Sequence, residues 1–146
     1  MRPTPRSHGI SVLESCFVVA IVAMLAASAA PSLIAARAVW GLHAAAGEVR
    51  AELHHTRILA IVGNRDCRMR VTSAVTYLVE CDGAGWVPVA FHEMPAGFTI
   101  TANNRPEFHP YGNVGPMATI SVWNGKGTRI RLVVSRSGRV RTAYGS

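Results

Sequence analysis

The sequence of 146 residues contains no acidic residue after Glu107. The same C-terminal region carries the basic residues Lys126, Arg129, Arg131, Arg136, Arg139 and Arg141. Because no acid balances this charge, the region should attract a polyanion, which can be nucleic acid, an acidic lipid or an acidic protein. Lysine is scarce too, since Lys126 is the only lysine among 15 basic residues. Arginine favours bidentate phosphate or carboxylate contacts, although GC-rich coding bias gives the same preference.

Metal-binding and catalytic motifs are also missing. His54 and His55 are neighbours, so on a helix their side chains would point about 100° apart. No cysteine or carboxylate completes a metal-ligand spacing with them, with His92 or with His109. No nucleophile elbow or related signature surrounds any serine, histidine or aspartate. We therefore expect no metal, no cofactor and no enzymatic activity.

Cysteine is limited to three residues. Cys67 and Cys81 flank a segment with the pattern of a β-hairpin. If the domain lies outside the cytoplasm, these two are the natural disulfide pair, and the bridge would stabilise the fold by about 3 kcal/mol. Cys16 lies in an apolar stretch and is expected to stay free, facing lipid or neighbouring helices.

Charged residues are absent between residues 15 and 33. From Ile10 onward about 20 residues are apolar enough to span a bilayer. Arg2 and Arg6 precede this stretch, and positive charge stays on the cytoplasmic side of a membrane. The sequence therefore predicts an inner-membrane anchor with the C-terminal domain facing outward.

One acid, Glu14, stands at the start of the apolar stretch, as the fifth residue after Gly9. A carboxylate there costs about 2.5 to 3.5 kcal/mol on insertion scales, so it needs a purpose. A basic leader, a glycine, this acid and an apolar run, in that order, resemble the type IV prepilin signal. An ordinary secretory signal cleaved at Ala27-Ser28-Ala29 is the alternative.

A helix is predicted to continue beyond the apolar stretch. Pro31 removes a backbone donor and should kink the helix. Val49, Leu53 and Ala60 then fall on one stripe, and Gly63-Asn64 is a plausible stop.

After Asn64 the hydrophobic period changes to two, which predicts antiparallel strands. The expected strands are 67–71, 76–81, 86–91, 98–102, 117–123 and 128–135. In the last of these, Ile130 should face the core while Arg129 and Arg131 face outward. Three tryptophans, Trp40, Trp86 and Trp123, are expected to be core or packing residues, with contact between Trp123 and a nucleic-acid base as an alternative.

An N-terminal helix followed only by antiparallel strands resembles the α+β fold of type IV pilins and pseudopilins. Within that group the chain resembles the GspH/FimT family over essentially its full length. The signal GISVLE is similar to the usual GFTLIE, and the ending VVSRSGRVRT contains the terminal G-R-x-R motif at Gly138, Arg139, Val140 and Arg141. The segment 106–113, PEFHPYGN, is similar to a family box, with His109 and Asn113 in place of Asp and Arg.

The resemblance implies a division into a leader (1–9), a transmembrane and assembly half of the helix (10–33), a second half packed on the globular domain (34–63) and a β-domain (64–146). It implies cleavage by a prepilin peptidase between Gly9 and Ile10. Glu14 would pair with the new amino terminus of a neighbouring pilin, because a buried carboxylate and a buried ammonium relieve each other's desolvation. The protein would then leave the inner membrane for a pilus on the cell surface.

The resemblance also implies binding of double-stranded DNA, during uptake, through the G-R-x-R motif. Arg139 and Arg141 are two residues apart, so both guanidinium groups point the same way on an extended chain, and Gly138 can turn the chain before them. A solvated tail without DNA contact is the alternative for these residues. For the whole chain, the alternative is a purely structural pseudopilin of a type II secretion system or a pilus-priming subunit.

Overall fold

The computed structural model describes residues 12–145. Side chains are described throughout this range except at residues 29–31, 33–35 and 144–145. One helix, α1 (Val12–Gly63), is followed only by strands, which confirms the predicted α+β class. The chain forms two compact units, residues 1–37 and residues 38–146, and α1 contributes to both.

The first unit contains the N-terminal part of α1, which is assigned without a break through Pro31. The kink expected at this proline stays a prediction. Apolar side chains such as Phe17 and Met24 are exposed here, and Cys16 is a free, exposed cysteine. In the described part of the chain, no helix combines the length and the apolar character needed to cross a membrane.

Helix α1 ends where Gly63-Asn64 predicts. Asn64 adopts a positive φ of 47°, a conformation that asparagine tolerates better than most residues. The amide of Arg65 then donates to the carbonyl of Ala60 at 3.2 Å, which satisfies an otherwise free helix carbonyl. The chain therefore turns directly from α1 into the first strand.

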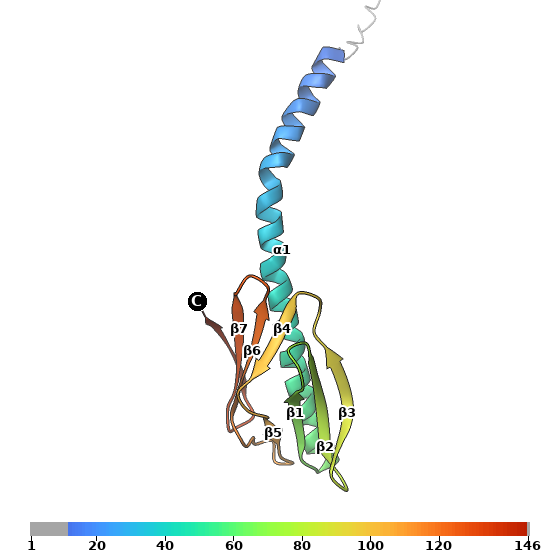
Figure 1. Ribbon diagram of the computed structural model, residues 1–146, viewed down its shortest axis with the longest axis vertical. Helices are drawn as coiled ribbons and strands as arrows, with labels where there is room; N and C mark the ends of the chain where they lie inside the picture. The colour runs from blue at the N-terminus through green and yellow to red at the C-terminus, as the bar shows by residue number, and fades with distance from the viewer. Residues whose placement is uncertain (1–11, 146) are drawn as a thin grey trace, which may run out of the picture. The chain divides into compact units, whose positions relative to one another are not determined.

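Eight strands make up the rest of the second unit. They are β1 (Cys67–Val71), β2 (Thr76–Asp82), β3 (Trp86–Glu93), β4 (Phe98–Ala102), β5 (Glu107–Phe108), β6 (Ala118–Asn124), β7 (Arg129–Val134) and β8 (Val140–Gly145). They form two antiparallel sheets, with the strand orders β3-β2-β1-β5 and β4-β6-β7-β8 (Figure 1). The sequence predicted the longer strands within one or two residues, but it did not predict β5 or the pairing of β8 with β7.

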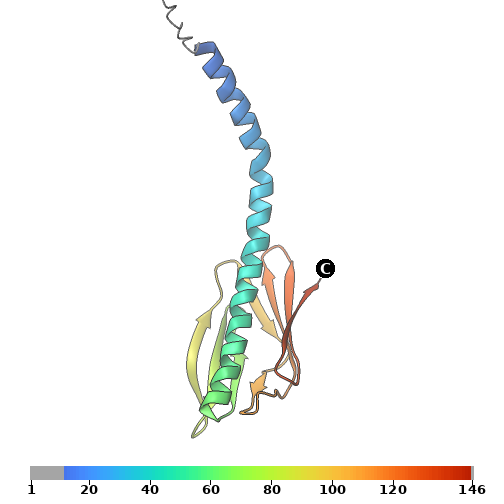
Figure 2. The same ribbon diagram turned by 180° about the vertical axis from the view of Figure 1, so that it is seen from behind.

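The hydrophobic core lies between the C-terminal half of α1 and the inner faces of both sheets. Val49, Leu53 and Ala60 are fully buried, as their common stripe predicted. Ile120 and Leu132 face them from the second sheet within the same cluster. Figure 2 shows this half of α1 lying across the strands.

None of the tryptophans is a core residue, but Trp86 and Trp123 are packing residues, so the prediction fails only for Trp40. Trp40 is 75% exposed. Trp86 packs instead under the guanidinium group of Arg68, whose Cζ lies 3.8 Å from the ring centroid. Leu42, two residues after Trp40, is buried in the core, so Trp40 lies on the face of α1 that points away from the sheets.

The predicted disulfide joins Cys67 and Cys81. These residues are directly opposite each other in the pairing of β1 with β2, and both are fully buried. The bridge therefore links the central strands of the first sheet within the core.

On the other face of the same two strands, Glu80 is buried and binds two arginines. Its carboxylate accepts from Arg68 Nε at 2.8 Å and from the Arg70 guanidinium at 2.7 Å. Burial alone would raise the pKa of the Glu80 carboxyl, but the hydrogen bonds from Arg70 and Arg68 outweigh burial and hold that pKa below its ordinary value of 4.5.

A group whose pKa is lowered by folding stabilises the fold above its unfolded pKa and loses that contribution as the pH falls through its folded pKa. We therefore expect the free energy of unfolding of the wild type to fall as the pH is lowered below about 4.5. In Glu80→Gln this acid-dependent loss should be smaller, and the variant should be less stable than the wild type at pH 7. Urea unfolding at a series of pH values measures both effects, and parallel pH profiles for the two proteins would contradict the assignment.

Candidate nucleic-acid interface

Strand β7 separates its apolar and basic residues onto opposite faces. Ile130, Leu132 and Val134 are buried in the core, as predicted. Arg129 and Arg131 are partly exposed on the outer face of the sheet. This alternation follows from the two-residue period of a strand.

Two further arginines lie at the start of β8: Arg139 directly precedes the strand and Arg141 is its second residue. Val140 is buried, while Arg139 and Arg141 on either side of it are exposed. Arg141 lies opposite Val133 of β7, and the amide of Ser135 donates to the carbonyl of Arg139 at 3.0 Å. The two arginines therefore project from the same side of a segment that is hydrogen-bonded to the end of β7 and to its neighbour Ser135, and not from an unpaired tail.

The turns at both ends of β7 carry the remaining basic residues predicted for the site, Lys126 and Arg136, and both are exposed. We call the following set the basic face: Lys126, Arg129, Arg131, Arg136, Arg139 and Arg141. None of these residues has an ion pair among the described residues, and the Nε atom of Arg131 is buried without a hydrogen-bond partner. By contrast, Arg68 and Arg70 both form ion pairs with Glu80.

The rest of this outer face is uncharged. The strand sequences FTITA, ATISVWN, RIRLVV and VRTAYG contain no acid. Ser121 lies opposite Arg131, and Trp123 lies opposite Arg129. The Arg129 guanidinium carbon is 5.0 Å from the Trp123 ring centroid, so the ring helps to hold this arginine.

Gly138 is the residue that allows the turn before Arg139. It has a positive φ of 75°, and it is buried between Arg57 of α1 and the loop at Gly112. Arg57 Nε donates to the carbonyl of Gly112 at 3.0 Å. A Cβ added at Gly138 would overlap that carbonyl and would lie 2.8 Å from Arg57 Nε.

We expect Gly138→Ala to destabilise the fold by at least about 1 kcal/mol from its φ alone, and by more because of the overlap. The change should also displace Arg139. Gly125→Ala is the matched control, because this turn glycine has no positive φ and nothing lies within 4 Å of its Cβ position. Thermal unfolding compares them, and equal melting temperatures would contradict the role given to Gly138.

The other site residues predicted for the N-terminal region are Gly9, Ile10 and Glu14. Gly9 and Ile10 fall outside the described residues. Glu14 is exposed in the first turn of α1, in the first unit. Its pairing with another subunit stays a prediction.

Two groups of residues were missed by the sequence analysis. Arg57 packs against the turn at Gly138 and donates a hydrogen bond to Gly112. Arg57 and Gly112 are 55 residues apart in the chain. Asp66 and Glu107 lie beside His109, although Asp66 and His109 are 43 residues apart in the chain. Rules based on residue spacing cannot predict contacts between residues so far apart in the chain. For the contact of Arg57 with Gly112, the only local signal in the sequence is the glycine itself.

No protein-family model matches the sequence, and no match was found among curated proteins. Among solved structures, the type IV minor pilin FimU of Pseudomonas aeruginosa is similar, with a TM-score of 0.60 and 20% identity over 70% of this chain and 87% of that chain. The minor pseudopilin EpsH of the type II secretion system of Vibrio cholerae has a TM-score of 0.62 and 14% identity over 73% of this chain and 96% of that chain. The chain therefore has the fold of type IV minor pilins and minor pseudopilins, as its sequence predicted.

Proposed function

We propose that this chain is a minor type IV pilin of the FimT type that binds extracellular double-stranded DNA during DNA uptake. The single observation that carries the proposal is the basic face, where four arginines lie on the outer face of one sheet or directly beside it and two further basic residues are exposed in the turns at the ends of β7. Its role is binding and not catalysis.

Phosphate is the part of DNA that this face suits. Strand β7 has six residues, so the row of arginines along β7 and β8 extends about 20 Å, enough to contact several phosphates. Arginine can donate two hydrogen bonds to one phosphate, and the hydroxyl of Ser121 beside Arg131 can add another. Phosphate contacts carry no sequence information, so binding should be independent of sequence.

In this proposal the N-terminal region directs processing, membrane anchoring and assembly into the pilus. A prepilin peptidase cleaves after Gly9, and Ile10 becomes the first residue of the mature chain. The apolar stretch anchors the protein in the inner membrane before assembly. Glu14 then pairs with the amino terminus of a neighbouring pilin, which explains why a carboxylate occurs there.

A purely structural role is the second candidate. It is favoured by the similarity to EpsH, whose TM-score of 0.62 is slightly above the 0.60 of FimU. In this role the chain is a subunit of a pseudopilus or a priming subunit of a pilus, and the basic face contacts no DNA. A structural role by itself does not require an acid-free outer face on the second sheet.

Complementation of a deletion strain separates the two candidates. We expect wild-type chain to restore DNA uptake, and Arg139→Ala with Arg141→Ala to restore fibre assembly without restoring uptake. The control carries Arg65→Ala with Arg105→Ala, two exposed arginines outside the basic face, and should restore both functions. If the Arg139 and Arg141 variant restores full uptake, DNA binding through the basic face is wrong; if deletion abolishes secretion and leaves uptake intact, the structural role is favoured.

A further inference from the structure

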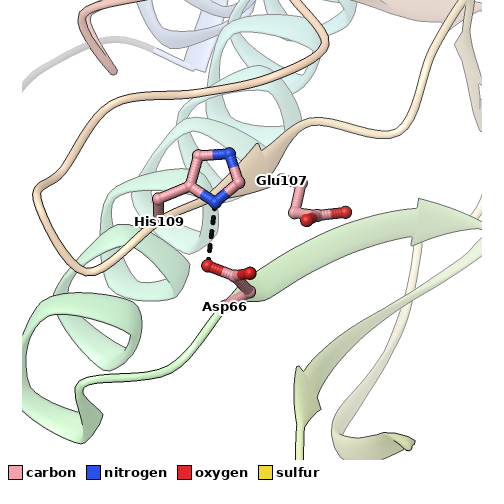
Figure 3. Close-up of side chains that lie close together, drawn as sticks. All are labelled: Asp66, Glu107 and His109. Carbon is pink, nitrogen blue, oxygen red and sulfur yellow. Dashed lines mark hydrogen bonds and ion pairs between the residues drawn. The ribbon is translucent and has the colours of Figure 1, made fainter.

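Three potential metal ligands meet beside the first sheet, away from the basic face. Asp66 follows the end of α1, Glu107 belongs to β5, and His109 comes directly after β5 (Figure 3). One ligand atom from each side chain lies within 4.8 Å of the other two. All three side chains are half-buried, so water and ions can reach them.

The backbone holds these residues in place. Strand β5 pairs with β1, with Phe108 opposite Cys67 and Glu107 opposite Arg68. The carbonyl of Glu107 accepts from the amide of Gly115 at 3.0 Å, and the amide of His109 donates to Asn113 at 3.0 Å. The ligands therefore stand on a paired strand and a hydrogen-bonded turn, which keeps them near one geometry without a metal.

A bound cation would reduce the repulsion between the two carboxylates of this group. His109 Nδ1 lies 2.8 Å from Asp66 Oδ1, which gives one carboxylate a partner. The carboxylate of Glu107 has no hydrogen bond or ion pair among the described residues. Two carboxylates side by side repel each other unless a positive charge lies between them.

We propose that Asp66, Glu107 and His109 form a site for a divalent cation of the zinc type. Imidazole nitrogen and carboxylate oxygen together suit Zn²⁺ better than Ca²⁺ or Mg²⁺, which prefer oxygen ligands alone. Three protein ligands leave a fourth position for water or for a group from another molecule. The inference does not depend on DNA binding.

The bound ion would connect the end of α1 to the loop after β5. In the same loop, the carbonyl of Gly112 accepts a hydrogen bond from Arg57 Nε. The amide of Val114 donates to the carbonyl of Arg136 at 2.8 Å. Binding of the ion should therefore raise the stability of the folded chain.

Titration of the full-length protein in mild detergent with Zn²⁺ alone tests the site. Isothermal titration calorimetry should give one Zn²⁺ per chain, and Zn²⁺ should raise the melting temperature of the wild type. We expect Asp66→Asn, Glu107→Gln and His109→Ala each to weaken binding by at least about tenfold. Binding should also weaken as the pH falls, because the ligands must lose their protons.

His55→Ala is the matched control, because His55 is an exposed histidine on α1 outside the group. It should bind Zn²⁺ as the wild type does, and circular dichroism should show that every variant is folded. X-ray absorption of the zinc complex should report nitrogen and oxygen ligands at about 2.0 to 2.2 Å. The proposal is wrong if the folded wild type binds no Zn²⁺, or if the three ligand variants bind it as tightly as the control.

Discussion

Arg139→Ala combined with Arg141→Ala should weaken binding to duplex DNA by about 30-fold at low salt. Two charge-assisted contacts to phosphate contribute roughly 1 kcal/mol each, and about 2 kcal/mol corresponds to this factor. Each phosphate contact that is lost should also reduce the magnitude of the slope of log affinity against log salt concentration by about 0.9. Both effects follow from the exposed position of the two side chains, one directly before β8 and one within it. Fluorescence anisotropy with labelled duplexes of random sequence measures them.

The control for this prediction changes the net charge by the same amount. Arg65→Ala combined with Arg105→Ala removes two exposed arginines outside the basic face. If the effect came from net charge alone, this control would lose as much affinity as the Arg139 and Arg141 variant. We expect it to bind DNA within a few-fold of the wild type, and equal losses in the two variants would contradict a localised interface.

Loss of the disulfide should have the largest effect on stability. Cys67→Ala combined with Cys81→Ala removes a bridge that closes a short loop, at a cost of about 3 kcal/mol. For a unit of about 100 residues this corresponds to a fall in melting temperature of roughly 10 to 20 °C. Thermal unfolding followed by circular dichroism measures the change.

Reductant provides the internal check on the disulfide. Addition of dithiothreitol should lower the melting temperature of the wild type. It should leave the melting temperature of the double alanine variant unchanged. Cys16→Ala is the matched control, because Cys16 is free and exposed, and its melting temperature should equal that of the wild type. A double variant as stable as the wild type would show that the bridge does not stabilise the fold.

Local patterns predicted most of the fold because the residues concerned obey local rules. The stripe at Val49, Leu53 and Ala60 identified the buried face of α1, and the Gly63-Asn64 pair identified its end. Alternation in β7 placed Ile130 and Arg129 on opposite faces. The sequence did not reveal that the strands form two sheets, since this depends on which strands pair across the loops.

The basic face was predicted residue by residue, but its spatial order was not. The absence of acids after Glu107 identified the region, and the G-R-x-R motif identified its end. The pairing of Arg141 with Val133 brings β8 beside β7 and joins both rows of arginines. Long-range contacts such as Arg57 with Gly112, or Asp66 with His109, depend on the folded chain and leave no periodic signal.

Trp123 is a packing residue and not a core residue, and alternation along β6 explains which of the two predicted environments it takes. A tryptophan is expected in the core because its apolar area is large. In β6 the inward positions are taken by Ile120 and Val122, so Trp123 falls on the outer face by alternation. There it packs against Arg129 and donates to Thr101 at 3.3 Å.

Salt dependence of DNA binding by the full-length wild-type protein tests the central claim most directly. Binding through three to five phosphate contacts predicts a plot of log affinity against log salt with a slope of about −2.7 to −4.5. The slope should be the same for duplexes of unrelated sequence, because phosphate contacts carry no sequence information. A slope near zero, or no measurable binding at low salt, would contradict the account.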